Sequence, residues 1–99
     1  MKVEALSQRI EQMHKSGAVH RSGVRLDEVT IDMASAHLVD ELGELRRAYA
    51  RGTFVEQLDE AGDMLDIVLH LFYLMGLPLE HVVYAGDRKL TQRFSEVRA

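Results

Sequence analysis

Acidic side chains recur as two pairs in the middle of this 99-residue chain, and each pair is spaced by three residues. Glu41 and Glu44 form the first pair, and Glu60 and Asp63 form the second. Residues three apart on a helix share a face, with roughly 5–6 Å between their Cβ atoms, so each pair can direct two carboxylates to one point. If the two helices pack antiparallel, four carboxylates converge, and a hard divalent cation relieves their repulsion. Magnesium prefers oxygen ligands and binds substrate phosphates while it retains water.

The competing interpretation of these residues is a solvated acidic face, which is the usual meaning of a single pair. Neither pair has a lysine four residues further on to relieve the repulsion, and no lysine or arginine occurs from residue 52 to residue 87. Two such pairs on consecutive helices, each beside an apolar stripe, favour the metal site. Calcium fits less well, because no loop carries the EF-hand ligand pattern.

Apolar residues at three- and four-residue steps predict the four helices that would position these pairs. The first helix begins at Val3 and ends near Ser16-Gly17, and an aperiodic loop follows to Asp27. Asp27 is a good N-cap residue for the second helix, and Gly52 is a suitable stop. No segment shows the alternation of a strand. The sequence therefore predicts an all-α fold.

The second half of the chain predicts the remaining two helices. Thr53 is a suitable cap for the third helix, with Glu56 in capping-box position. Gly76 ends that helix, and Pro78 fits the first turn of the fourth. Because the connections are short, we expect antiparallel neighbours in a four-helix bundle. From Met64 onward the third helix is apolar nearly all round, which predicts a partner subunit and a bundle completed by oligomerisation.

Composition limits the class of protein. Residues 1–99 make one domain by length, and the net charge of −4 argues against binding to a nucleic-acid polymer. There is no cysteine, so a metal must be held by oxygen or imidazole. The longest apolar run is too short to cross a bilayer, and the first residues lack the apolar core of a signal peptide. We therefore expect a cytoplasmic protein without membrane contact.

The two acidic motifs resemble those of the MazG-like, all-α nucleoside triphosphate pyrophosphohydrolases. The signature of that family is Glu-Glu-x-x-Glu on one helix and Glu-x-x-Asp on the next. This chain has Asp40-Glu41-Leu42-Gly43-Glu44 and Glu60-Ala61-Gly62-Asp63. The resemblance covers about residues 30–95. It implies a magnesium-dependent enzyme, with manganese as a possible substitute, that hydrolyses a (d)NTP to a (d)NMP and pyrophosphate and acts as a homodimer or homotetramer.

The resemblance also implies roles for individual residues. Glu41, Glu44, Glu60 and Asp63 would bind the metal, and Glu41 or Asp40 would orient the attacking water. Asp40 departs from the family pattern, which prefers glutamate, so no ligand role is carried over to it. Lys89 and Arg93 on the last helix resemble the basic residues with which the family holds the phosphates of its nucleotide substrate. His37 lies one turn before Glu41, and its position leaves two interpretations open: contact with a nucleobase or phosphate of the substrate, or a packed or surface histidine.

Two further interpretations remain open. The first is phosphoribosyl-ATP pyrophosphohydrolase, a relative with the same helical core, which ranks second because its Ser-Tyr-Thr stretch before the acidic helix is missing here. The other is a nonenzymatic helical interaction module, which predicts no metal dependence. His14, His20 and His81 form no pattern in the sequence, and His70 is expected in the interior or at a subunit interface.

Overall fold

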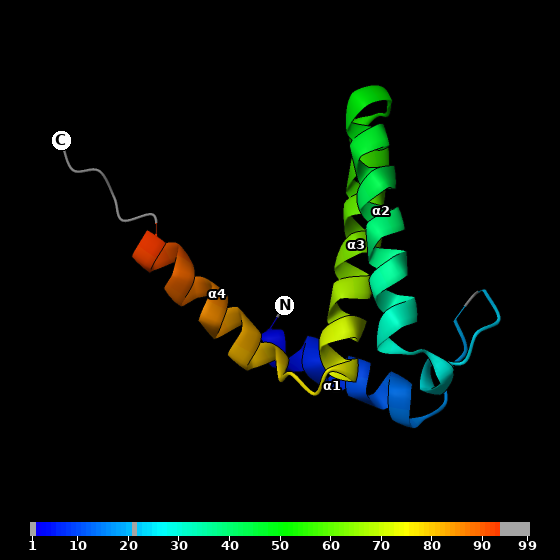
Figure 1. Ribbon diagram of the computed structural model, residues 1–99, viewed down its shortest axis with the longest axis vertical. Helices are drawn as coiled ribbons and strands as arrows, with labels where there is room; N and C mark the ends of the chain where they lie inside the picture. Colours follow the sequence, from blue (N-terminus) through cyan, green and yellow to red (C-terminus); the bar gives the residue numbers. More distant parts are fainter. Residues whose placement is uncertain (1, 21, 94–99) are drawn as a thin grey trace.

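Four helices and one short 3-10 turn make up the structure, a computed structural model that describes residues 2–20 and 22–93. In chain order the elements are α1 (Val3–Lys15), η1 (Leu26–Glu28), α2 (Ile31–Arg51), α3 (Phe54–Leu74) and α4 (Leu79–Arg93). Figure 1 shows α2 and α3 side by side as a long hairpin that stands on α1, while α4 extends to one side. The all-α prediction is confirmed for the described residues.

The loop between α1 and α2 is more ordered than its sequence indicates. Gly17 has a φ of 69° and turns the chain after α1. Val19 and Arg25 then form an isolated antiparallel bridge, and the Arg25 guanidinium donates to both carboxylate oxygens of Asp27, at 3.0 and 2.8 Å. The predicted N-cap at Asp27 is therefore wrong. The α2 helix begins three residues later than that cap predicts, where the Thr30 hydroxyl accepts from the backbone N–H of Met33 at 3.1 Å.

The α2–α3 hairpin is built as the sequence predicts. The α2 helix ends at Arg51, and Gly52 and Thr53 alone connect it to α3. The Thr53 hydroxyl accepts from the backbone N–H of Glu56 at 3.2 Å, which confirms Thr53 as the N-cap. So short a connection turns the chain back on itself, and the two 21-residue helices run antiparallel along their length.

The end of α3 directs α4 away from the hairpin. Gly76 has a φ of 73° and follows the last turn of α3, as predicted. The Pro78 carbonyl accepts from the backbone N–H groups of His81 and Val82, so Pro78 lies just before the first turn of α4. The axes of α3 and α4 differ by 113°. Among the described residues α4 contacts α1 and α3 but not α2, so one chain does not form a closed bundle.

The interior of a single chain is small. Its buried apolar side chains lie where α1, η1 and α4 meet the lower part of the hairpin, and they are Ile10, Leu26, Ala34, Ile67, Leu71 and Leu79. The accessible surface is 7822 Å², whereas a compact protein of this mass exposes about 5,700 Å². The radius of gyration is 15.8 Å, against about 13 Å for a compact domain of this length.

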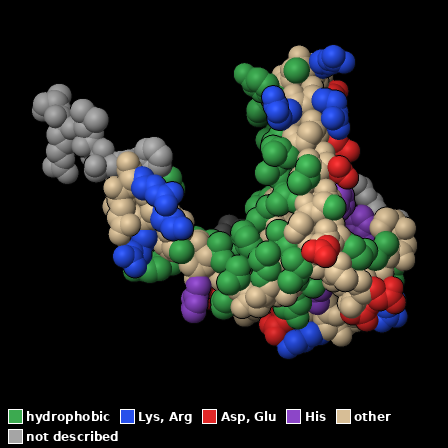
Figure 2. All heavy atoms as spheres, viewed as in Figure 1, with side chains coloured by type: hydrophobic (Ala, Val, Ile, Leu, Met, Phe, Trp, Pro, Cys, Tyr) green, Lys and Arg blue, Asp and Glu red, His purple; other side chains and the backbone are tan. Residues whose placement is uncertain are grey.

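Much of the extra surface is apolar and lies on one side of the hairpin, the side that faces α4 in Figure 2. We call it the apolar face. Large apolar side chains that are strongly exposed on the two hairpin helices include Val39, Leu42, Tyr49, Phe54, Val55, Leu58 and Leu65. The predicted stripes of α2 and α3 are therefore only partly covered in one chain.

In the described part, no single helix is long and apolar enough to cross a membrane, and only the bent pair of α3 and α4 passes that test together.

Candidate active site

Three carboxylates converge on the side of the hairpin opposite the apolar face. One oxygen atom from each of Glu41, Glu60 and Asp63 lies within 4.8 Å of the other two. Glu41 comes from α2 and the other two come from α3, so the antiparallel hairpin brings together three of the four carboxylates that the spacing predicts to converge. Glu44 lies one turn along α2, is exposed, and adjoins Glu60. Asp40 is exposed and does not belong to the group of three.

The electrostatics of the cluster show a shortage of positive charge. Burial, followed by the charges of Glu44 and Asp63, raises the pKa of Glu41, and His37 partly opposes the rise. Partial burial, followed by hydrogen bonding and repulsion from Glu44, raises the pKa of Glu60. Each of these carboxylates therefore holds its proton more tightly than an isolated glutamate does, because it is withdrawn from water and because its neighbours carry the same charge.

Two carboxylate oxygen atoms without hydrogen-bond partners indicate that a divalent cation fits here. Glu41 Oε2 and Glu60 Oε2 are both buried, and neither has a hydrogen-bond partner among the described residues. Buried carboxylate oxygens without partners are costly. A hard cation bound between α2 and α3 would satisfy both atoms and neutralise the repulsion. The donor set is entirely oxygen, which suits magnesium or manganese.

His37 orients one of these carboxylates. Its Nε2 lies 3.2 Å from Glu41 Oε1, so one oxygen of Glu41 is held by imidazole, while Oε2 is buried and has no hydrogen-bond partner among the described residues. A partner of this kind fixes the orientation of a metal ligand. His37 also lines a neighbouring pocket, so it lies between the carboxylates and that pocket.

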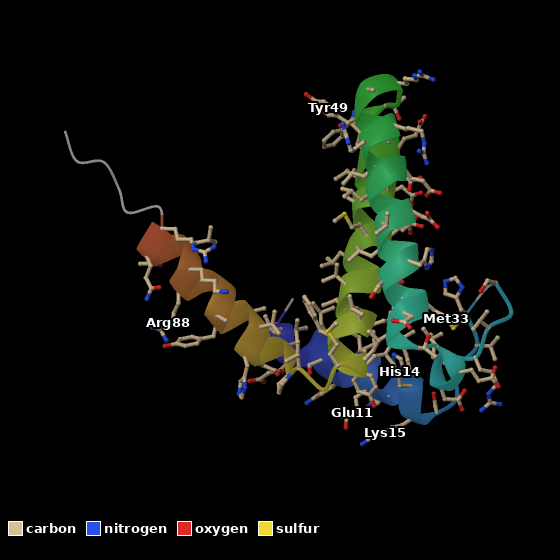
Figure 3. All side chains as sticks on the ribbon, viewed as in Figure 1. Glu11, His14, Lys15, Met33, Tyr49 and Arg88 are labelled. Atoms are coloured by element: carbon tan, nitrogen blue, oxygen red, sulfur yellow. The ribbon has the colours of Figure 1, made fainter. Side chains whose placement is uncertain are left out.

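The pocket next to the carboxylates, which we call the histidine pocket, has a volume of about 390 Å³. It lies between the α1–α2 loop, the first turns of α2 and the middle of α3. Apolar side chains such as Leu26, Met33 and Ile67 line most of it, and Figure 3 shows Met33 at the start of α2 beside the loop. Its polar side chains are His20, Ser22, His37, Asp66 and His70. An apolar pocket with a few polar groups is the usual form of a small-molecule site.

Sequence reasoning missed the arrangement of the histidines. His70 Nδ1 and His14 Nε2 are 2.8 Å apart, and His70 Nε2 lies 3.4 Å from Asp66. His14 is buried, and its ring stacks on Tyr73 with the centroids 4.3 Å apart. His20, for which no pattern was found, lines the histidine pocket. These residues lie on α1, the loop and α3, so no spacing along the chain indicates that they meet.

The predicted phosphate-binding residues lie elsewhere in the single chain. Lys89 and Arg93 are both exposed on α4. Because α4 has no contact with α2 in the described part of the chain, the structure does not bring them to the carboxylates within one subunit.

Comparison with known proteins identifies the family. The family model for phosphoribosyl-ATP pyrophosphohydrolase matches residues 27–89, which include all four carboxylates. The chain belongs to this family. It is a member of the MazG-like all-α superfamily, so the predicted resemblance and four-helix fold class are confirmed. No curated protein and no solved structure matches the chain significantly.

Membership of the phosphoribosyl-ATP pyrophosphohydrolase family also determines the class of reaction. The chain is a nucleotide pyrophosphohydrolase, an enzyme that acts on phosphoric anhydrides. The nonenzymatic interpretation is therefore set aside. Among the two enzymatic interpretations, the match favours the one that the sequence motifs ranked second.

Proposed function

We propose that the chain hydrolyses phosphoribosyl-ATP to phosphoribosyl-AMP and pyrophosphate, with magnesium as its cofactor. The observation that carries the proposal is the family match over residues 27–89, which spans the carboxylate cluster and most of the histidine pocket. Manganese is a plausible replacement, since it accepts the same oxygen ligands.

The carboxylates hold the cofactor and the water in this proposal. Glu41, Glu60 and Asp63 bind the cation, and Glu44 joins them from the adjacent turn. Bound magnesium would draw charge from the phosphate oxygens and lower the pKa of a coordinated water. Glu41 is the better candidate for orienting that water, since His37 holds its other oxygen. Asp40 remains a second candidate, although it lies outside the group of three.

The reaction breaks one phosphoanhydride bond. The oxygen of water forms a bond to the α-phosphorus, and the bridging oxygen leaves with the β- and γ-phosphates as pyrophosphate. The proton of the attacking water passes to a nearby carboxylate. The nucleoside part of the substrate occupies the histidine pocket, which adjoins the cluster through His37.

A second copy of the chain completes the enzyme in this proposal. The apolar face and the surplus accessible surface support a homodimer or homotetramer with the hairpin at its interface. Lys89 and Arg93 would then reach the phosphates of the neighbouring subunit, because α4 extends away from its own hairpin. A cytoplasmic location stays a prediction from the sequence.

General hydrolysis of (d)NTPs is the second candidate function. One observation favours it: Glu28-Val29-Thr30 precedes α2 here, without the Ser-Tyr-Thr stretch expected of a phosphoribosyl-ATP enzyme.

Phosphorus NMR with and without magnesium decides between the two candidates. The purified protein is assayed with phosphoribosyl-ATP, ATP and the four dNTPs, and Glu4→Gln serves as a control for loss of an exposed glutamate. We expect pyrophosphate as the product and kcat/KM for phosphoribosyl-ATP at least about a hundredfold above that for ATP. Equal rates with the dNTPs would favour the second candidate, and orthophosphate as the sole product would refute both.

A further inference from the structure

A second hollow continues the carboxylate site toward the far end of the hairpin. We call it the arginine groove; it has a volume of about 330 Å³ and is lined by the last turns of α2 and the first turns of α3. Glu44 and Glu60 belong to its lining, so the groove is contiguous with the cluster. Arg47 and Arg51 supply its basic groups. Figure 2 shows basic side chains gathered at this end of the hairpin, with acidic side chains beside them.

The groove and the histidine pocket lie on the same stripe of α2 but on opposite sides of the cluster. His37, Glu41, Glu44 and Arg51 follow one another at steps of four, three and seven residues, which keep to one helix face. A ligand that passes the cluster therefore has the histidine pocket at one end and the arginine groove at the other.

Neither Arg47 nor Arg51 forms an ion pair with the acidic groups around it in the described part of the chain. The groove is also lined by Glu44, Glu56, Asp59 and Glu60, yet neither guanidinium lies within 4.0 Å of a carboxylate oxygen in the described part of the chain. Guanidinium groups are suited to bidentate binding of phosphate. The two arginines thus offer donors about one and two helical turns beyond Glu44, which they follow by three and seven residues.

Gly43 shapes the position of one of these arginines. A Cβ atom at Gly43 would lie 3.3 Å from one terminal nitrogen of Arg47, so the guanidinium rests over the space that a side chain would fill. Glycine is unfavourable in the interior of a helix. Here it leaves room for the Arg47 guanidinium to fold back by one turn and lie beside Gly43.

We propose that Arg47 and Arg51 bind the β- and γ-phosphates of the substrate within the same subunit, and hold pyrophosphate as it leaves. This inference rests on the proposed function. The substrate then lies along the hairpin, with its nucleoside in the histidine pocket and its terminal phosphates toward Gly52. Glu41, Glu60 and Asp63 would hold a magnesium ion next to the groove, and its charge would offset the acidic lining.

The test compares Arg47→Ala and Arg51→Ala with Arg46→Ala, which removes the same charge from the same helix outside the groove. Inhibition by magnesium pyrophosphate and by AMP is measured for each full-length variant, with calorimetric binding of magnesium pyrophosphate as a readout that needs no turnover. We expect pyrophosphate affinity to fall roughly tenfold to hundredfold in each groove variant. AMP inhibition and the Arg46→Ala variant should match the parent, and Arg47→Lys should recover part of the loss.

Two results separate this inference from the proposed function. If the enzyme hydrolyses nucleotides but both groove variants bind pyrophosphate like the parent, the arginine groove is wrong and the proposed function stands. If no nucleotide is hydrolysed but the groove variants still lose pyrophosphate affinity, the groove stands as a phosphate site and the proposed function fails.

Discussion

Truncating the apolar face should weaken self-association without unfolding the subunit. Leu58 and Leu65 are 58% and 56% exposed in the single chain. Complete burial of a leucine side chain contributes roughly 1.5–3 kcal/mol, so covering the exposed half of one contributes about 1 kcal/mol. In a two-fold dimer each side chain counts twice. Leu65→Ala should therefore cost about 2 kcal/mol of association, which is roughly a 30-fold weaker dimer.

Sedimentation equilibrium across a concentration series measures this change directly. Leu65→Asp should dissociate the dimer at micromolar concentration, because it would bury a charge in each subunit. Val19→Asp is the matched control, since Val19 is 60% exposed but lies on the loop. Far-ultraviolet circular dichroism checks that the helices persist. A parent protein that sediments as an 11.2 kDa monomer, or a Leu65→Asp variant that associates like the parent, would refute the reasoning.

The remaining predictions concern the metal, the reaction, acid stability and the core. Glu60→Gln should weaken magnesium binding in calorimetry while raising the stability of the metal-free protein, because it removes a repelled charge; unchanged metal affinity would contradict the site. Glu44→Ala should abolish turnover with an unchanged circular dichroism spectrum, whereas Lys89→Ala should mainly raise KM. Burial, followed by the charge of His70, lowers the pKa of His14 below its ordinary 6.5. Above pH 6.5 the imidazole is neutral in both the folded and the unfolded chain. Below that pH the unfolded chain takes up a proton that the folded chain resists, so the free energy of unfolding should decrease as the pH drops. In urea titrations at several pH values, His14→Phe should reduce this decrease. Leu71→Ala should cost about 2–5 kcal/mol of stability as a lower midpoint in urea.

The sequence was most informative where structure depends on neighbours along the chain. Thr53 and Gly76 mark the ends of α3 because a cap and a left-handed glycine act within one helical turn. The exception is Asp27, a good cap residue by type. Its carboxylate is instead bound by Arg25, two residues away, and buried Leu26 holds the intervening turn in place, so Thr30 caps α2.

For the candidate site, too, the sequence predicted the features that depend on residues close together in the chain and missed those that depend on packing. The three-residue spacing of each acidic pair and the short Gly52-Thr53 connection were enough to predict that carboxylates meet across the hairpin. They were not enough to show that Glu41 and Glu60 each keep a buried oxygen without a partner, because burial depends on packing between the helices.

Only the tertiary structure decided what surrounds the carboxylates. The histidine pocket joins His20 of the loop to His70 of α3, fifty residues later, and the arginine groove exists because two antiparallel helices enclose it. The 113° angle between α3 and α4 likewise separates Lys89 from its own hairpin. Helical periodicity and caps are properties of adjacent residues, so the sequence alone determined the helices and the acidic motif. Pockets, angles and exposed faces arise from contacts between residues far apart in the chain, which no local spacing encodes.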